Sequence, residues 1–135
     1  MYVPEAFAET DLTTLHALMR EHPLATLVSL NGERLQASHV PLVLYPDEGH
    51  FGTLRGHLAR ANPQWSTRTE AVEALCIFHG PEAYITPSWY PSKQEHGRVV
   101  PTWNYAVVHA RGRLEFFEDA VRLRNAVERL NSSLW

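Results

Sequence analysis

The feature that most constrains the fold is a series of short apolar segments joined by links of hairpin length. Residues 24–30 and 34–45 are separated by Asn31-Gly32, a dipeptide typical of tight β-turns because both residues tolerate positive φ. Residues 46–49 and Gly80-Pro81 carry similar turn signals. Strands joined by such short links pair with their neighbours in antiparallel orientation. The sequence therefore predicts a mainly antiparallel β structure that closes into a small barrel.

Two amphipathic helices are predicted near the two ends of the chain. Asp11, or Thr10 before it, can cap a helix that His22-Pro23 ends, and Asp119 can cap the last helix. About six or seven strands are expected between them, with a bend, bulge or edge position at Pro41. They span residues 24–30, 34–45, 50–54, 73–79, 83–86, 99–108 and 110–117. Residues 58–61 form one helical turn, or Asn62 caps a helix over residues 63–69. The sequence leaves both open.

Length and charge bound the class of protein. The chain has 135 residues, which fits one domain, and its formal net charge of -3 lacks the basic excess expected of a nucleic-acid binder. Cys76 is the single cysteine and lies in an apolar run, which predicts a buried, unreactive thiol and excludes an intramolecular disulfide. No signal peptide and no apolar stretch of membrane-spanning length is visible, so a cytoplasmic protein is expected.

Several well-known functional motifs are missing from the sequence. There is no Gly-x-Ser-x-Gly elbow, no His-Glu-x-x-His, no dinucleotide-binding glycine motif and no Walker loop. The eight histidines are scattered without helical ligand spacing, so no metal site is predicted. A helix-turn-helix requires two adjacent helices, whereas the two clear helices lie far apart in the chain. A ligand would have to be held by a different scaffold.

Hydrogen-bond donors are concentrated in residues 52–65, Gly-Thr-Leu-Arg-Gly-His-Leu-Ala-Arg-Ala-Asn-Pro-Gln-Trp. The side chains of Arg55, His57, Arg60 and Asn62 suit a phosphate group, although an exposed turn with solvated arginines has the same composition. Polar and aromatic residues elsewhere would suit a flat aromatic ligand with a phosphate tail, because tryptophan can stack on such a ring. Each tryptophan taken alone is more often a core residue.

Three long motifs resemble one known family. The segments Gly-His-Leu-Ala-Arg-Ala-Asn-Pro-Gln-Trp (56–65), Phe-His-Gly-Pro-Glu-Ala-Tyr-Ile-Thr-Pro-Ser-Trp-Tyr (78–90) and Val-Val-Pro-Thr-Trp-Asn-Tyr (99–105) strongly resemble the PaiB-type FMN-binding negative transcriptional regulator family. The resemblance implies a mainly β fold with flanking helices, namely an antiparallel split β-barrel of the kind found in pyridoxamine-phosphate oxidases and flavin reductases. It also implies FMN bound non-covalently at a homodimer interface.

The resemblance assigns candidate FMN contacts position by position. In similar barrels the second strand and the turn after the third strand hold the flavin ring edge and the phosphate. The matching residues here are Ser38, His39, Thr53, Leu54, His57, Arg60 and Asn62. The residues that match the family's later motifs are Ser88, Trp89, Lys93, Thr102 and Trp103. No catalytic residue is nominated.

Three functions stay open on this basis. The first is an FMN-binding transcriptional repressor, linked in the family to sporulation and degradative-enzyme genes, although no DNA-binding motif is visible. The second is an FMN-dependent oxidoreductase similar to a flavin reductase, and the third is a dimerising barrel module without flavin. Family members continue well past the last helix, so residues 1–135 are expected to form one barrel domain that lacks the family's C-terminal segment. The third function rests on this difference in length.

Overall fold

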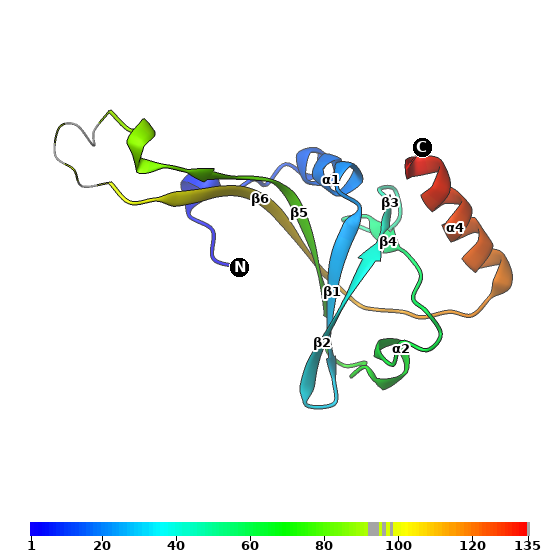
Figure 1. The fold of residues 1–135 in the computed structure, drawn as a ribbon. Coiled ribbons are helices and arrows are strands. Elements are labelled where there is room, and N and C mark those ends of the chain that lie inside the picture. Colours follow the sequence, from blue (N-terminus) through cyan, green and yellow to red (C-terminus); the bar gives the residue numbers. More distant parts are fainter. Residues whose placement is uncertain (92–94, 96, 98, 135) are drawn as a thin grey trace.

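A computed structural model describes residues 1–91, 95, 97 and 99–134 (Figure 1). Its elements, in chain order, are η1 (Glu5–Phe7), α1 (Leu12–Glu21), β1 (Leu24–Asn31), β2 (Arg34–Pro41), β3 (Val43–Tyr45), β4 (Thr53–Arg55), α2 (Gln64–Thr67), β5 (Ala74–Ile85), η2 (Pro87–Trp89), β6 (Thr102–Gly112) and α4 (Ala120–Leu134). The strands form a four-stranded sheet in the order β2-β1-β5-β6 and a two-stranded sheet of β3 and β4. Every strand pair is antiparallel, which confirms that part of the prediction. Both sheets are open, so the expected barrel is not confirmed.

The β1–β2 hairpin turns one residue later than the sequence predicts. β1 runs through Asn31, so the two turn residues are Gly32 and Glu33, and Gly32 has a φ of 64°. A glycine with positive φ at the first central position is the pattern of a type II′ turn. The side-chain amide of Asn31 is used elsewhere, because it donates to the carbonyl oxygen of Gln64 and to the hydroxyl of Thr67. Asn31 therefore attaches α2 to the end of β1.

Proline and glycine residues determine where strands begin, end or continue at three places in the chain. β2 is an edge strand of the large sheet and ends at Pro41, and Leu42 leads from it into β3, which confirms the edge position among the three alternatives predicted for Pro41. The strand expected over residues 50–54 is shorter, because Gly52 has a φ of 96° and β4 begins only after it. The turn expected at Gly80-Pro81 is wrong: β5 passes through it with a register shift between His79 and Glu82. One bulged strand replaces the two expected there.

The helical assignments are partly resolved by side-chain caps. Asp11 accepts from the backbone N–H of Thr14 at the start of α1, and Asp119 accepts from that of Arg122 at the start of α4. Of the two alternatives for residues 58–69, the second is confirmed in part. A helix forms there, but α2 is only one turn long, and its N-cap is Pro63, without a side-chain cap, rather than Asn62. The strand expected to run on to residue 117 ends at Gly112, and residues 113–118 extend from β6 to α4 outside both sheets. We call residues 113–118 the connecting segment.

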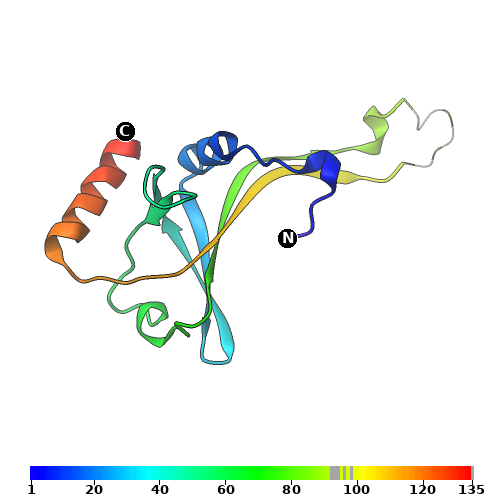
Figure 2. The same cartoon turned by 180° about the vertical axis from the view of Figure 1, so that it is seen from behind.

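The core lies on one face of the four-stranded sheet. Ala25, Phe78 and Val108 are buried on this face beneath Met19 of α1. Helix α4 covers the small sheet, where Leu130 packs with two residues of β3. Figures 1 and 2 show α2, α4 and the small sheet on the same side of the large sheet. We call this side of the large sheet its inner face and the opposite side its outer face.

Beyond the bulge, β5 and β6 continue as a two-stranded ribbon away from the rest of the molecule (Figures 1 and 2). We call residues 82–89 and 102–105 the arm. It is paired in register from Glu82–Tyr105 to Ile85–Thr102, so its backbone is a regular continuation of the large sheet. The arm carries residues 82–89 of the second sequence motif and residues 102–105 of the third away from the first motif.

Candidate functional site

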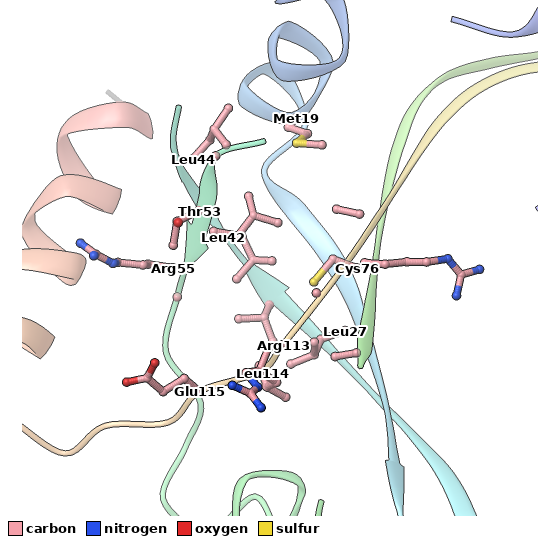
Figure 3. A pocket seen from close by; sticks show the side chains of 18 of the residues that line it. Met19, Leu27, Leu42, Leu44, Thr53, Arg55, Cys76, Arg113, Leu114 and Glu115 are labelled. Carbon is pink, nitrogen blue, oxygen red and sulfur yellow. The ribbon is translucent and has the colours of Figure 1, made fainter. Parts of the chain in front are cut away.

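A cavity of about 820 Å³ lies between the small sheet and the inner face of the large sheet. This volume is within the range of roughly 300–1,000 Å³ typical of small-molecule sites. Figure 3 shows Leu42 and Leu44 on one wall and Leu27 and Cys76 on the other, with Leu114 of the connecting segment nearby. These walls are apolar because alternate residues of each strand point inward. The cavity could accommodate a flat hydrophobic group.

The opening of this cavity is lined by strand edges. Residues 51–58 and 108–118 line it consecutively, whereas only alternate residues would line it if a sheet face were presented. β4 pairs with β3 only, and β6 is the last strand of its sheet. Backbone N–H and C=O groups along the facing edges are therefore available as donors and acceptors.

Basic side chains gather around this opening, which we call the rim. They are Arg55, His57, Arg60 and Arg113, together with Arg111 at the end of β6. Three of them have carboxylate partners. Arg55 lies 2.7 Å from Glu48, Arg60 lies 3.2 Å from Glu118 and Arg111 lies 3.9 Å from Glu73. Arg55 is further held over the ring of Tyr45, whereas the Arg60 side chain is 83% exposed. Arg60 is thus the rim arginine most open to a ligand among those with ion pairs in the described chain.

Four of the predicted site residues lie at this opening: Thr53, Leu54, His57 and Arg60. The hydroxyl of Thr53 donates to the carbonyl oxygen of Glu48, which closes the turn before β4. His57 and Arg60 follow β4 in an extended stretch whose course depends on Gly56. A Cβ at Gly56 would lie 2.7 Å from both Pro41 O and Leu42 Cδ2, so only glycine allows this close approach to the end of β2.

Ser38 and His39 are adjacent in sequence but point to opposite faces of the large sheet. Ser38 is half-buried and accepts a hydrogen bond of 2.9 Å from the side-chain amide of Asn62. His39 is exposed on the outer face, where its Nδ1 lies 3.2 Å from the hydroxyl of Thr26. The structure therefore separates His39 from the cavity, and it pairs Ser38 with Asn62 rather than leaving both open to a ligand.

The residues predicted from the later motifs lie on the arm, far from the cavity opening (Figures 1 and 2). Ser88 and Trp89 belong to η2, where the hydroxyl of Thr86 accepts from the backbone N–H of Ser88. Thr102 and Trp103 begin β6. Lys93 lies outside the described residues. One chain does not bring these residues to the rim.

A buried glutamine is the main residue that sequence reasoning missed. Gln64 has no exposed surface, and its Nε2 donates to Leu27 O, Gln36 O and Ser29 Oγ at 2.9–3.2 Å. Its backbone N–H donates to the Oδ1 of Asn62. Residues 62–67, which we call the latch, therefore bind the inner side of the β1–β2 hairpin. The sequence signal for the latch is the dipeptide Asn62-Pro63 before a short helix. The polar side chain of Asn62 was instead interpreted as a ligand contact.

The connecting segment was also missed, since it was expected to be part of a strand. Arg113, Leu114 and Glu115 line the cavity, and Phe116 lies under the guanidinium of Arg68 at 4.8 Å. Its alternation of charged and apolar residues resembles a strand in sequence. The charged residues Arg113 and Glu115 lie at the cavity instead of in a strand. The sequence alone does not predict this, because it depends on where β4 lies in the fold.

Burial raises the pKa of the Cys76 thiol to about 11, so this thiol in the cavity wall is protonated at neutral pH. That agrees with the predicted unreactive thiol. The pKa of His109 on β6 is lowered by burial and then by the positive amino terminus, Arg111 and His79.

In the described part of the chain, no group of three His, Cys, Asp or Glu side chains could hold a metal ion. Nor is any helix there long and apolar enough to cross a membrane.

Comparison with known proteins gives the family. The model of the family described as "Putative FMN-binding domain" matches residues 1–134. The chain is 35% identical over 118 residues to "Protease synthase and sporulation protein PAI 2" of Bacillus subtilis, covering 87% of this chain and 54% of that protein. It is 36% identical to an uncharacterized protein of Aspergillus fumigatus, covering 89% of this chain and 58% of the relative. An uncharacterized protein of Saccharomyces cerevisiae is 29% identical, with 88% and 80% covered.

Two facts follow from these matches. The chain spans a little over half the length of the Bacillus and Aspergillus relatives. The family match, by contrast, extends over nearly every residue of the chain and includes the cavity opening, the latch and the arm. The chain belongs to the PaiB-type FMN-binding domain family.

Proposed function

We propose that this domain binds FMN at the cavity opening, with the phosphate held by the rim. The observation that carries the proposal is the position of His57 and Arg60 beside an apolar cavity, in a chain whose family is named for FMN binding. A guanidinium and an imidazole can both donate to phosphate oxygens, and charge-assisted hydrogen bonds are the strong ones. The apolar wall beside them suits the flavin ring.

The existing ion pairs at the rim are compatible with a phosphate. Both partners of Arg60–Glu118 are largely exposed, and such surface pairs contribute only about 0–1 kcal/mol. A phosphate dianion carries more charge and more acceptor oxygens than one carboxylate, so it would replace Glu118 at Arg60 at little cost. Glu118 and the other rim carboxylates would then favour the cofactor's orientation by repelling its phosphate from their side.

We further propose that the two sheets are parts of a split barrel. The main support is continuity, since β2 passes into β3 after Pro41 and links the two sheets along one chain segment. The unpaired edges of β4 and β6 face one cavity, as the two sides of an incomplete barrel would. On this proposal residues 1–135 are one barrel domain, and the longer relatives carry further segments beyond the matched part.

A homodimer is part of the same proposal. Trp89 and Trp103 lie on the arm, remote from the rim of their own chain (Figure 1). They can contribute to an FMN site at the rim only if a second copy brings its arm there. The family motifs on the arm support such a shared site, and the arm's exposed side chains are free to take part in it.

We favour a regulatory role over catalysis. FMN, when bound, supplies hydride and one-electron transfer. Among the described residues at the opening, the cysteine is held protonated, and the pKa of His109 is shifted downward rather than toward that of a stronger base. The name of the Bacillus relative also refers to synthesis of a protease and to sporulation. Since the net charge is -3, control of transcription would involve a partner protein or a further segment for DNA contact.

The test is a titration of FMN into the purified chain, followed by flavin fluorescence and absorbance. We expect saturable binding that Arg60→Ala weakens about tenfold, the loss of roughly one charge-assisted contact. Arg34→Ala, at the distant β1–β2 turn, is the matched control and should bind as the unmodified chain does. Equal affinity for all three proteins would remove the rim assignment, and no binding by any of them would refute the cofactor.

A further inference from the structure

A second, smaller cavity of about 70 Å³ lies between β4 and the first half of α4, and we call it the α4 pocket. It is lined by Arg55, Phe117, Arg122, Asn125 and Ala126. Arg55 and Phe117 also line the large cavity, so they form the wall between the two spaces. A water molecule needs only about 10–15 Å³ of such space. The α4 pocket therefore has room for a group of several heavy atoms.

Two arginines enter the α4 pocket from different elements. Figure 3 shows the side chain of Arg55 pointing from β4 toward α4, away from the apolar walls of the large cavity. Arg122 comes from α4, and its guanidinium carbon lies 4.1 Å from the centroid of the Phe117 ring. Asn125, one turn later on the helix, adds an amide that can donate hydrogen bonds. None of the described residues that line the pocket is acidic.

A third arginine extends this basic surface along α4. Arg122, Ala126 and Arg129 recur at helical spacing, so they share the face of α4 that rests on the small sheet. The guanidinium carbons of Arg129 and Arg55 lie 4.0 Å and 4.3 Å from the centroid of one ring, that of Tyr45. The two charges are thus about one screening length apart at physiological salt, roughly 8 Å, and they repel each other.

Carboxylates offset only part of this positive charge. Glu48 pairs with Arg55, and Asp119 accepts from the backbone N–H of Arg122. Among the described residues, the guanidiniums of Arg122 and Arg129 have no carboxylate partner. Stacking on aromatic rings holds a guanidinium in place but leaves its charge and its N–H donors available. An anion in the α4 pocket would supply the missing negative charge.

We propose that the α4 pocket binds an oxyanion, the carboxylate or phosphate group of a small molecule other than FMN. The guanidinium fork matches the oxygens of both groups, and stacking preorganises it so that little side-chain freedom is lost on binding. The shared wall of Arg55 and Phe117 lets the rest of such a molecule extend toward the large cavity. The site does not depend on FMN, because its residues differ from His57 and Arg60 of the rim.

The test is a calorimetric titration of the full chain with two probes, inorganic phosphate and succinate, at low salt and without FMN. We expect saturable binding of at least one probe, and binding of only one identifies the group that the pocket accepts. Arg122→Gln should weaken this binding about tenfold and Asn125→Leu about threefold, since a charge-assisted contact is the stronger of the two. Arg124→Gln is the matched control, because it removes the same charge from the opposite, exposed face of α4.

Three results would overturn the proposal. The first is that neither probe binds saturably. The second is equal affinity of Arg122→Gln and Arg124→Gln, since the attraction would then depend only on overall charge. The third is a site that Arg60→Ala removes and Arg122→Gln keeps, because that site would be the rim. Flavin binding is measured separately by fluorescence and should be unchanged in Arg122→Gln, so a failure of FMN to bind affects none of these outcomes.

Discussion

The rim and the latch come from one polar stretch of sequence, yet they use their side chains in opposite ways. In the rim part, residues 52–60, His57 and Arg60 are exposed at the cavity opening. In the latch, residues 62–67, Asn62 and Gln64 direct their amides into the protein. Pro63 marks the change, because the chain leaves its extended course there and begins α2.

This difference shows that the number of hydrogen-bond donors in a segment does not distinguish a ligand site from a segment that forms hydrogen bonds within the protein. Buried polar groups in proteins are nearly always hydrogen-bonded, and the side-chain amide of Gln64 donates to backbone carbonyls of β1 and β2. The latch thus holds the start of the rim in place. If the two parts really differ, variants in the latch should change stability and variants in the rim should change binding.

The largest expected effect is on stability, from Gln64→Leu. The substitution keeps roughly the side-chain volume but removes the amide that bonds Leu27 O, Gln36 O and Ser29 Oγ. Leaving buried acceptors unpaired should lower the free energy of unfolding by about 3 kcal/mol. Urea unfolding measures it. Arg60→Leu is the rim counterpart and should change stability by less than about 0.5 kcal/mol. Equal losses of stability in Gln64→Leu and Arg60→Leu would contradict the distinction between the latch and the rim.

Asn62→Ala should have the next largest effect. It removes the hydrogen bond to Ser38 and the acceptor for the backbone N–H of Gln64, at a cost of about 1–2 kcal/mol. Ser38→Ala should cost less, and the double variant should cost less than the two losses added. FMN affinity measured on the folded variants should stay within about twofold. A variant of normal stability that no longer binds FMN would return Asn62 to the cofactor site.

The same contrast shows how far the sequence alone could lead. The antiparallel order, both long helices and the end of β2 at Pro41 follow from local patterns, because each depends on residues close in the chain. The bulge at residues 79–82 does not, since Gly-Pro reads as a turn unless the pairing with β6 is known. The burial of Gln64 depends likewise on backbone carbonyls more than 25 residues away.

Site prediction divides in a similar way. Thr53 and Leu54 lie in β4, and His57 and Arg60 follow this strand directly, so a short segment sufficed to place them together. His39 lies on the opposite face of the sheet from Ser38, because successive residues of a strand point to opposite faces. The arm residues were predicted to belong to the same site as the rim residues because of the family motifs. Within a single chain the arm residues and the rim residues do not lie together.

A smaller effect should come from pH, through His109 beside the cavity opening. Its pKa is lowered in the folded chain, so the unfolded chain binds more protons as pH falls below the usual value of 6.5. Stability from this group is fully present above about pH 6.5 and is lost as pH falls through the lowered value. Urea midpoints measured from pH 7.5 to 5 should therefore fall less in His109→Gln than in the unmodified chain. Identical pH profiles would show that His109 makes no contribution.

The smallest expected effect is at the rim, from Glu118→Gln. Removing this carboxylate frees Arg60 and should tighten FMN binding about twofold to threefold at low salt, with the difference declining as salt screens the charges. Riboflavin, which lacks the phosphate, should bind both proteins equally. Glu9→Gln, on the exposed N-terminal segment, controls for the change in net charge. A gain shared by riboflavin would mean that Glu118 acts on the ring or on the fold.

The central claim is that the rim recognises the phosphate of FMN, and the most direct measurement compares FMN with riboflavin on two proteins. Dissociation constants would be determined by flavin fluorescence for the unmodified chain and for Arg60→Ala. We predict that the unmodified chain prefers FMN by at least about tenfold and that Arg60→Ala loses most of this preference while binding riboflavin as before. Equal affinity of the unmodified chain for both flavins, or a preference that survives in Arg60→Ala, would contradict the account.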